Sequence, residues 1–181
     1  YCATAAAVSS EKRRIAFESG MQIVDWVNRN IKPLDILTRD TLRNAIIVDL
    51  AMGGSTNSFL HILALSNAVK NSLTEDKNQE ELVSLKDFEE LSHKIHQFVK
   101  LEPSSNITMT TFHHAGGIPA VVNELAKSVP EYKNKECKEV YTDRSVIHKY
   151  SEPFTTKPGL GILYGNIAPE GSVIKISAVD E

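Results

Sequence analysis

The 181-residue sequence contains little cysteine, with Cys2 and Cys137 as its two thiols. These two cysteines could form one disulfide, but they provide no framework of the kind that stabilises small secreted domains. A reduced pair in a cytoplasmic protein is the preferred interpretation. Because an iron–sulfur cluster usually takes several thiolate ligands, these two residues cannot supply a full set by themselves.

The sequence also lacks a large charge excess and any long hydrophobic run. Its formal net charge is −3, with acidic and basic residues interspersed. No basic patch or RNA-binding aromatic motif is present, which argues against a nucleic-acid partner. The longest apolar stretches, around 45–51 and 59–65, are too short to cross a bilayer. The first residues lack the basic segment and apolar core of a signal peptide, so we expect none.

What the sequence does contain is a series of helical patterns followed by strand-like segments. The helical patterns cover residues 9–28, 38–53, 55–69 and 84–99, and a further one follows Gly117. The segments 161–166 and 172–179 are rich in β-branched and aromatic residues, and the turn between them predicts a hairpin. This order indicates a helical or α/β part ending near residue 150 and the first strands of a β-rich part after it.

The helix predicted for residues 9–28 is expected to pack against the core. The residues expected to face the core recur at helical spacing and are Ile15, Ser19, Ile23, Trp26 and Val27.

The helix predicted to follow Ser84 begins with a capping box formed by Ser84 and Asp87. Its apolar residues continue at spacings of three or four to Val99, so this helix is predicted to extend that far.

The stretch MGGSTN at residues 52–57 separates two apolar helical segments. A helix start has backbone N–H groups without partners and a partial positive charge, so a carboxylate or phosphate would suit this place. The residues that would form such a cradle are Gly53, Gly54, Ser55, Thr56 and Asn57. The alternative is a plain helix–helix corner that binds nothing. The stretch HHAGGIP at 113–119 leaves the same two interpretations open.

The titratable residues show no spacing that is typical of a catalytic or metal-binding site. Asp49 lies inside an apolar run, so it is paired, exposed on the far side of its helix, or placed in a cleft with a shifted pKa. His113 and His114 are adjacent and point in different directions on any regular element. His93 and His96 could share one side of a helix, but no acidic or cysteine partner nearby completes a metal set. No Ser-His-Asp or Cys-His arrangement can be identified from the spacing.

Four blocks of the sequence, in order, resemble the dihydroxy-acid dehydratase and 6-phosphogluconate dehydratase family. They are PLDILTRDTLRNAI, NAIIVDLAMGGSTNSFLHILAL, KLEPSSNITMTTFHHAGGIPAVVNEL and GLGILYGNIAPEGSVIKISAVD. The resemblance covers nearly the whole chain and is weakest at about 70–84 and 128–150. DLAMGGSTN and YGNIAPEGSVIK are more similar to the dihydroxy-acid dehydratase branch, which serves branched-chain amino-acid (valine and isoleucine) biosynthesis. The sugar-acid dehydratases are the alternative.

The resemblance implies a fold of two domains. An α/β N-terminal domain carries an iron–sulfur cluster, and a β-barrel-like C-terminal domain closes over it. Residues 1–150 would be the C-terminal part of the first domain. Residues 151–181 would be the linker and the first β-hairpin of the second. Because Tyr1 is not a methionine and ISAVDE stops just after a strand-like run, we expect a piece of a longer protein.

The resemblance also implies a reaction, the removal of water from a 2,3-dihydroxy acid to give a 2-keto acid. In the family an iron–sulfur cluster acts as Lewis acid on the leaving hydroxyl, and Mg²⁺ holds the substrate. The cluster cysteines, the serine base and the magnesium carboxylates of the family find no counterpart in this chain. No catalytic or metal-binding residue is therefore assigned, and no cofactor is expected on this chain alone. The substrate-binding candidates are Gly53, Gly54, Ser55, Thr56 and Asn57.

We therefore predict a fragment of a dihydroxy-acid dehydratase-like hydro-lyase that is inactive by itself. The parent enzyme is expected to be cytoplasmic and homo-oligomeric, with a small dihydroxy acid as its partner and neither nucleic acid nor membrane. One alternative is a fragment of a 6-phosphogluconate-type dehydratase. The other is a non-catalytic module that uses the corner at Gly53–Asn57 to bind an anion.

Overall fold

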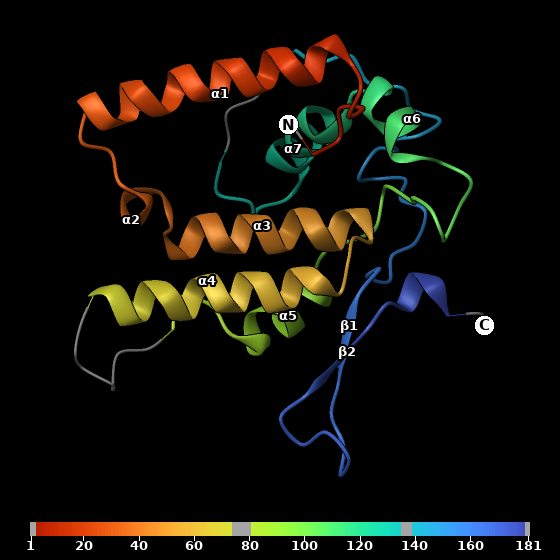
Figure 1. Cartoon of the computed structure of the whole chain (residues 1–181). Helices are drawn as coiled ribbons and strands as arrows, with labels where there is room; N and C mark the ends of the chain where they lie inside the picture. The colour runs from red at the N-terminus through yellow and green to blue at the C-terminus, as the bar shows by residue number, and fades with distance from the viewer. Residues whose placement is uncertain (1–2, 74–80, 135–138, 180–181) are drawn as a thin grey trace.

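The computed structural model describes residues 3–73, 81–134 and 139–179, so both cysteines lie outside the described residues. The elements in chain order are α1 (Ser10–Asn28), α2 (Pro33–Ile36), α3 (Arg39–Met52), α4 (Asn57–Leu73), α5 (Leu85–Ser92), α6 (Met109–His114), α7 (Gly117–Ser128), β1 (Gly161–Leu163), β2 (Ser172–Ile174) and the 3₁₀ turn η1 (Ile176–Ala178). The helices precede the two strands along the chain (Figure 1). The expected mainly helical α/β chain with a terminal hairpin is confirmed.

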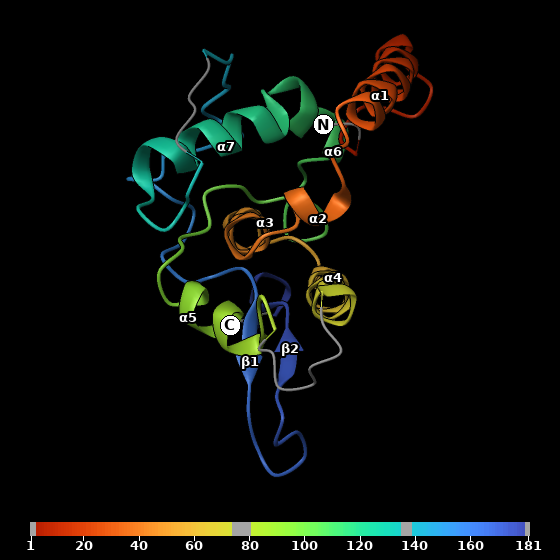
Figure 2. The same cartoon turned by 90° about the vertical axis from the view of Figure 1, so that its left-hand side faces the viewer.

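Helix α3 is at the centre of the fold. It lies beside α4 and contacts α5 on one side and α7 on another (Figures 1 and 2). Its Ile46, Ile47 and Leu50 side chains are completely buried. The other large side chains of the core come from all parts of the chain and include Phe59, Phe88, Phe98, Phe112, Leu91, Ile95, Leu125, Ile147 and Leu160. None of the helices in the described residues combines the length and apolarity needed to cross a membrane.

The local sequence sets both ends of α3. Thr38 caps the start, since its Oγ1 atom accepts a hydrogen bond from the N–H of Thr41 at 3.3 Å. Asp40 lies in the first turn, where the helix dipole favours a negative charge. At the other end Gly53 adopts a left-handed conformation with φ of 57°, which glycine reaches without a Cβ clash. Both predicted boundaries of this helix are confirmed.

The predicted hairpin is confirmed as well. Strands β1 and β2 are antiparallel, with Gly161 opposite Ile174 and Leu163 opposite Ser172. In the turn, the N–H of Gly171 donates to the carbonyl of Ala168 at 3.1 Å. Strand β1 also contacts α5. The C-terminal segment is thereby joined to the helical part of the chain.

Helix α5 is shorter than predicted. Its capping box is present, because the N–H of Ser84 donates to Oδ2 of Asp87 at 2.9 Å. The helix ends at Ser92, however, and the extension to Val99 is wrong. The chain there is extended because its backbone pairs with distant segments: the N–H of Gln97 donates to the carbonyl of Thr155 at 3.1 Å. The apolar spacing correctly predicted burial but not conformation.

Helix α1 is less buried than predicted, although Ile15 and Ser19 of the predicted set line the groove between α1 and the start of α7. Ser9 caps it as expected, and its Oγ accepts from the N–H of Lys12 at 3.1 Å. No residue of α1 is buried, so the expectation that its apolar residues face a core in this structure is wrong. Val27 and Ile23, for example, are 71% and 53% exposed. Figure 2 shows α1 standing at the edge of the molecule, apart from α3.

Candidate functional site

The corner between α3 and α4 holds the five substrate-binding candidates. Gly53 is buried, whereas the side chains of Ser55 and Asn57 are exposed. The N–H of Gly54 donates to the carbonyl of Asp49 at 3.0 Å, and the N–H of Asn57 donates to Oγ of Ser55 at 3.2 Å. Several backbone donors of the predicted cradle are therefore used inside the chain. The hydroxyl and amide side chains of the corner are the groups that face solvent.

Asp49 occupies the position in which an anion was expected. Its Oδ1 accepts from the N–H of Ser55 at 3.3 Å, and its Oδ2 accepts from the hydroxyl of Ser58 at 2.7 Å. Burial raises the pKa of the Asp49 carboxyl above its usual value, while the bonds from Ser58 and Ser55 oppose that shift. Of the three alternatives for this residue, exposure on the far side of the helix is wrong: the half-buried carboxylate is paired, and it lines a depression with a raised pKa.

The C-terminal segment closes the corner from outside. The Nζ atom of Lys175 donates to the carbonyl of Gly54 at 2.7 Å. Gly159 lies directly against Gly53, and a Cβ built on Gly159 would overlap the Cα atom of Gly53. Gln97 lies against both glycines and donates from Nε2 to the carbonyl of Val99 at 2.9 Å. Residues separated by more than one hundred positions thus form one packed unit.

A shallow depression adjoins this corner on its α3 side. It has a volume of about 490 Å³ and is lined by Thr41, Asn44, Ala45, Val48, Asp49, Met52, Gly54, Ser58, Ile62 and Tyr132. Its walls are mostly apolar, with the Asp49 carboxylate and the Ser58 hydroxyl on one side. A small organic molecule with an apolar part and a few hydroxyl groups suits such a surface.

Helix α7 starts at the second pair of glycines, as predicted. Gly116 has φ of 119° and Gly117 has φ of 56°, both in the left-handed region. A Cβ on Gly116 would overlap the carbonyl oxygen of Tyr141, so this backbone is already covered by another part of the chain. The N–H of Asp143 donates to the carbonyl of Ala115 at 2.9 Å. The plain-corner interpretation fits this start better than an anion site.

The histidines form no common centre among the described residues. His113 bridges two segments, with its Nδ1 atom 2.8 Å from Oγ1 of Thr4 and its Nε2 atom 3.1 Å from Glu11. The hydrogen bond from His113 holds the pKa of the Glu11 carboxyl below its usual value. His93 caps the end of α5 and His96 stacks on Tyr150, with ring centroids 5.1 Å apart. The interpretation that His93 and His96 share one helix is wrong.

No group of three or more His, Cys, Asp or Glu side chains in the described ranges could hold a metal ion. An iron–sulfur cluster needs several thiolates, and both cysteines lie outside those ranges. Mg²⁺ needs carboxylates arranged with room for water and substrate. The described residues therefore do not fit either group by themselves.

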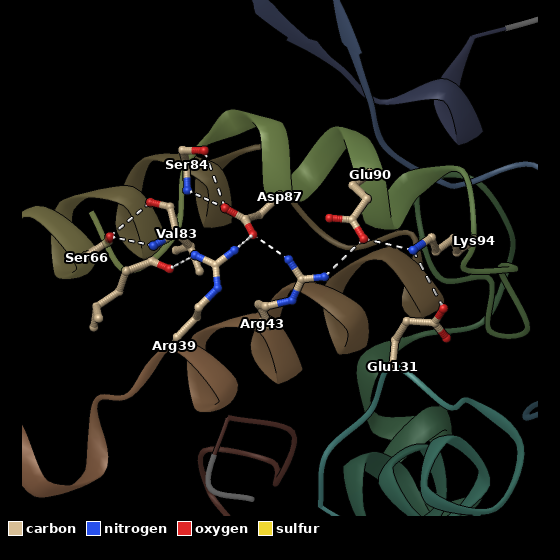
Figure 3. A network of polar contacts seen from close by, with 10 residues as sticks. Arg39, Arg43, Ser66, Val83, Ser84, Asp87, Glu90, Lys94 and Glu131 are labelled. Atoms are coloured by element: carbon tan, nitrogen blue, oxygen red, sulfur yellow. Dashed lines mark hydrogen bonds and ion pairs between the residues drawn. The ribbon is translucent and has the colours of Figure 1, made fainter. Parts of the chain in front are cut away.

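A charged network joins α3 to α5 and was not predicted from the sequence (Figure 3). Asp87 accepts from Nη2 of Arg39 at 2.6 Å and also pairs with Arg43. Its side chain is 7% exposed. Glu90 then pairs with both Arg43 and Lys94. The capping-box spacing was the available signal at Asp87, but the two arginine partners are more than forty positions away.

Comparison with known proteins places these features in a family. The family model described as "Dihydroxy-acid/6-phosphogluconate dehydratase N-terminal" matches residues 1–145, and the corresponding C-terminal model matches residues 145–181. The glycine contact of the corner and the Lys175 bond therefore join the two matched regions.

Similar curated proteins carry the name dihydroxy-acid dehydratase. One from Methanococcus vannielii is 42% identical over 99% of this chain, and one from Methanococcus maripaludis is 40% identical over 98%. One from Methanosphaera stadtmanae is 39% identical over 99%. The chain spans about a third of the length of these relatives, between 32% and 33%. By the two family matches and these relatives, the chain belongs to the dihydroxy-acid/6-phosphogluconate dehydratase family.

Proposed function

We propose that this chain forms a central part of a hydro-lyase that dehydrates 2,3-dihydroxy acids to 2-keto acids in valine and isoleucine biosynthesis. The observation that carries the proposal is the identity of about 40% across nearly the whole chain to proteins named dihydroxy-acid dehydratase. The relatives quoted above carry this name and not that of a sugar-acid dehydratase. This favours a dihydroxy acid over a sugar acid as the substrate.

The corner at Gly53–Asn57 is proposed to position substrate. Gly53 and Gly54 form its packed base, since the C-terminal segment holds them through Gly159 and Lys175. The exposed groups of Ser55 and Asn57, with the half-buried Thr56, can donate hydrogen bonds to a carboxylate or hydroxyl of the substrate. Asp49 holds the start of α4 from inside and so fixes the direction of these side chains.

The chemistry of water removal comes from groups that the described residues do not provide. We propose that an iron–sulfur cluster and Mg²⁺ are held by other parts of the complete enzyme, which is cytoplasmic and homo-oligomeric. The 181-residue chain alone is then a positioning and packing element without turnover.

A chimera tests the proposal. The matching third of the Methanococcus vannielii protein is replaced by these 181 residues, and the formation of 2-keto acid from 2,3-dihydroxyisovalerate is measured after cluster reconstitution. We expect turnover by the chimera and none by the 181-residue chain alone. A folded chimera that dehydrates only 6-phosphogluconate would contradict the proposed substrate class, and turnover by the chain alone would contradict its role as a part.

A matched pair of variants tests the corner. Thr56→Val in the chimera removes a hydroxyl and keeps the shape, so KM should rise about 5–10-fold, the value of one hydrogen bond. Thr110→Val makes the same change at an exposed position of α6 and should leave KM unchanged. An unchanged KM in the Thr56 variant would remove the corner from the substrate site.

A further inference from the structure

The orientation of α1 is the reverse of that of an ordinary surface helix. A groove of about 550 Å³ separates α1 from the start of α7. Four polar residues of α1, Glu11, Arg14, Glu18 and Gln22, line it together with Ile15 and Ser19. These positions recur at helical spacing, so the polar side of α1 faces the body of the molecule. A surface helix usually does the opposite, with its apolar side towards the core.

Four apolar side chains of α1 face solvent on the side of the helix away from the groove. Phe17, Met21, Val24 and Val27 are 71%, 61%, 59% and 71% exposed. Their spacing of three or four residues makes them one stripe along the helix. A contiguous apolar stripe of this kind marks an interaction surface.

Gly20 lies within the same stripe. Glycine in the middle of a helix is unfavourable relative to alanine, so its presence needs a reason. A Cβ built on Gly20 would have no atom within 4 Å, so nothing in the described structure requires glycine here. Small residues at a helix surface allow another backbone to approach closely. The glycine thus points to a second helix that crosses α1 at this position.

Among the described residues, α1 is bonded to the helical body through His113 and buries none of its own side chains. His113 makes one hydrogen bond to Glu11 on the helix and one to Thr4 just before it. In proteins most helical stability comes from the tertiary packing of an apolar face, and not from helix propensity. Helix α1 therefore needs a packing partner on its apolar side.

We propose that a helix from the polypeptide that the longer relatives carry beyond this region covers the stripe Phe17–Gly20–Val24–Val27. The inference rests on the proposed function, because it takes the complete enzyme to resemble relatives about three times as long. A second apolar surface, with Ile167 95% exposed, lies at the hairpin. Figure 1 shows α1 and the hairpin at opposite ends of the molecule. A two-fold contact with a second copy covers one patch twice, whereas a larger polypeptide can cover both.

Amide hydrogen exchange tests this surface. The 181-residue chain is compared with the Methanococcus vannielii chimera defined above. We expect the amides of α1 to exchange at least about tenfold more slowly in the chimera than in the chain alone. Equal exchange in a folded chimera would overturn the proposal. A dimeric chain with α1 already protected, as judged by sedimentation, would assign the surface to a second copy and also overturn it.

Substitutions in α1 should have opposite effects on the chain alone and on the chimera, which simple misfolding would not produce. Gly20→Ala should increase the helix content of the chain alone, because alanine favours helix. The same change should lower the melting temperature of the chimera, because the methyl group blocks the crossing helix. Val24→Asp should lower it further, and Gln22→Lys, on the polar side beside Glu18 and Asp25, should leave it nearly unchanged. If Gly20→Ala raised both the helix content of the chain alone and the melting temperature of the chimera, a close helix crossing at this position would be excluded.

Activity separates this inference from the proposed function. A chimera with protected α1 but no dehydration would support the packing surface and contradict the function. An active chimera with freely exchanging α1 would support the function and contradict the surface.

Discussion

Asp87 of α5 accepts a hydrogen bond from the guanidinium of Arg43 of α3, and this is the most buried ion pair of the charged network between the two helices (Figure 3). Arg43 is 16% exposed and Asp87 is 7% exposed, so both ions are largely removed from water. A buried ion pair gives little net stability, but the loss of one partner leaves an uncompensated charge.

Asp87→Asn should therefore reduce the free energy of unfolding of the 181-residue chain by about 3–5 kcal/mol. The variant leaves the charges of Arg39 and Arg43 without their common acceptor and weakens the capping box of α5. Urea unfolding followed by circular dichroism measures the change. Glu90→Gln removes an exposed member of the same network, and its cost should stay below about 1 kcal/mol. Similar losses in both variants would show that burial does not decide the effect.

Gly159→Ala should destabilise the chain by about 2–3 kcal/mol, because the added methyl group meets the backbone of Gly53 and the side chain of Gln97. The melting temperature of the purified variant gives the measurement. Gly165→Ala is the matched control, since a Cβ there has no atom within 4 Å, and its effect should stay within about 0.5 kcal/mol. A neutral Gly159 variant would mean that the corner and the C-terminal segment are not packed together.

Lys175→Met should cost about 1.5–3 kcal/mol, the range for a hydrogen bond from a charged donor. It removes the bond to the carbonyl of Gly54 while retaining an apolar stem of similar length. Lys149→Met changes an exposed lysine and should alter the free energy of unfolding by less than about 0.5 kcal/mol. Equal effects of the two changes would mean that the loss of positive charge, and not the bond to Gly54, is responsible.

Relative to the wild type, Asp49→Asn should be more stable at pH 7 than at pH 4. Because burial raises the folded-state pKa of Asp49, the folded protein binds a proton there more readily than the unfolded chain. The wild type then gains stability as the pH falls through that raised pKa, so the stability of the variant relative to the wild type should fall towards pH 4. Urea midpoints at both pH values test this.

Asp143→Asn should change the pH dependence of stability in the direction opposite to that of Asp49→Asn. Hydrogen bonds from the hydroxyl and N–H of Ser145 lower the pKa of the Asp143 carboxyl. Its stabilisation is present above the unfolded pKa and is lost as the pH falls through the lowered folded value. This variant should be less stable than the wild type at pH 7 and approach it in acid. Parallel trends in the two aspartate variants would contradict the assigned environments.

Local signals in the sequence were sufficient for several elements. Thr38 determines the start of α3 through its side chain, and Gly53 determines the end through its backbone freedom. Both ends were predicted. The hairpin also follows from β-branched segments around a turn. The short helices α2 and α6 were not predicted, although Pro33 and Thr108 mark their starts. They contain too few residues for a helical period to be evident.

Other features depend on distant parts of the chain and could not be predicted. The extended backbone at Gln97 exists because Thr155 pairs with it. The role of Asp49 depends on the turn that follows it, which brings Ser55 and Ser58 back to its carboxylate. The exposed apolar stripe of α1 was not predicted, because the helical spacing read from the sequence selected a different set that shares only Val27 with it. The assignment of substrate to the corner at Gly53–Asn57 stays a prediction.

The contact between Gly53 and Gly159 has a consequence for the order of folding. Lys175, which supports the same corner, is 121 positions from its acceptor in the chain. During synthesis from the N-terminus, the helices are made well before the segment that covers their corner. Contacts of such long sequence separation form late and slowly. Until the segment from Gly159 to Lys175 emerges, the nascent chain exposes the surfaces of Gly53 and Gln97 that this segment covers, which is the stage at which a chaperone or a protease would most readily recognise it.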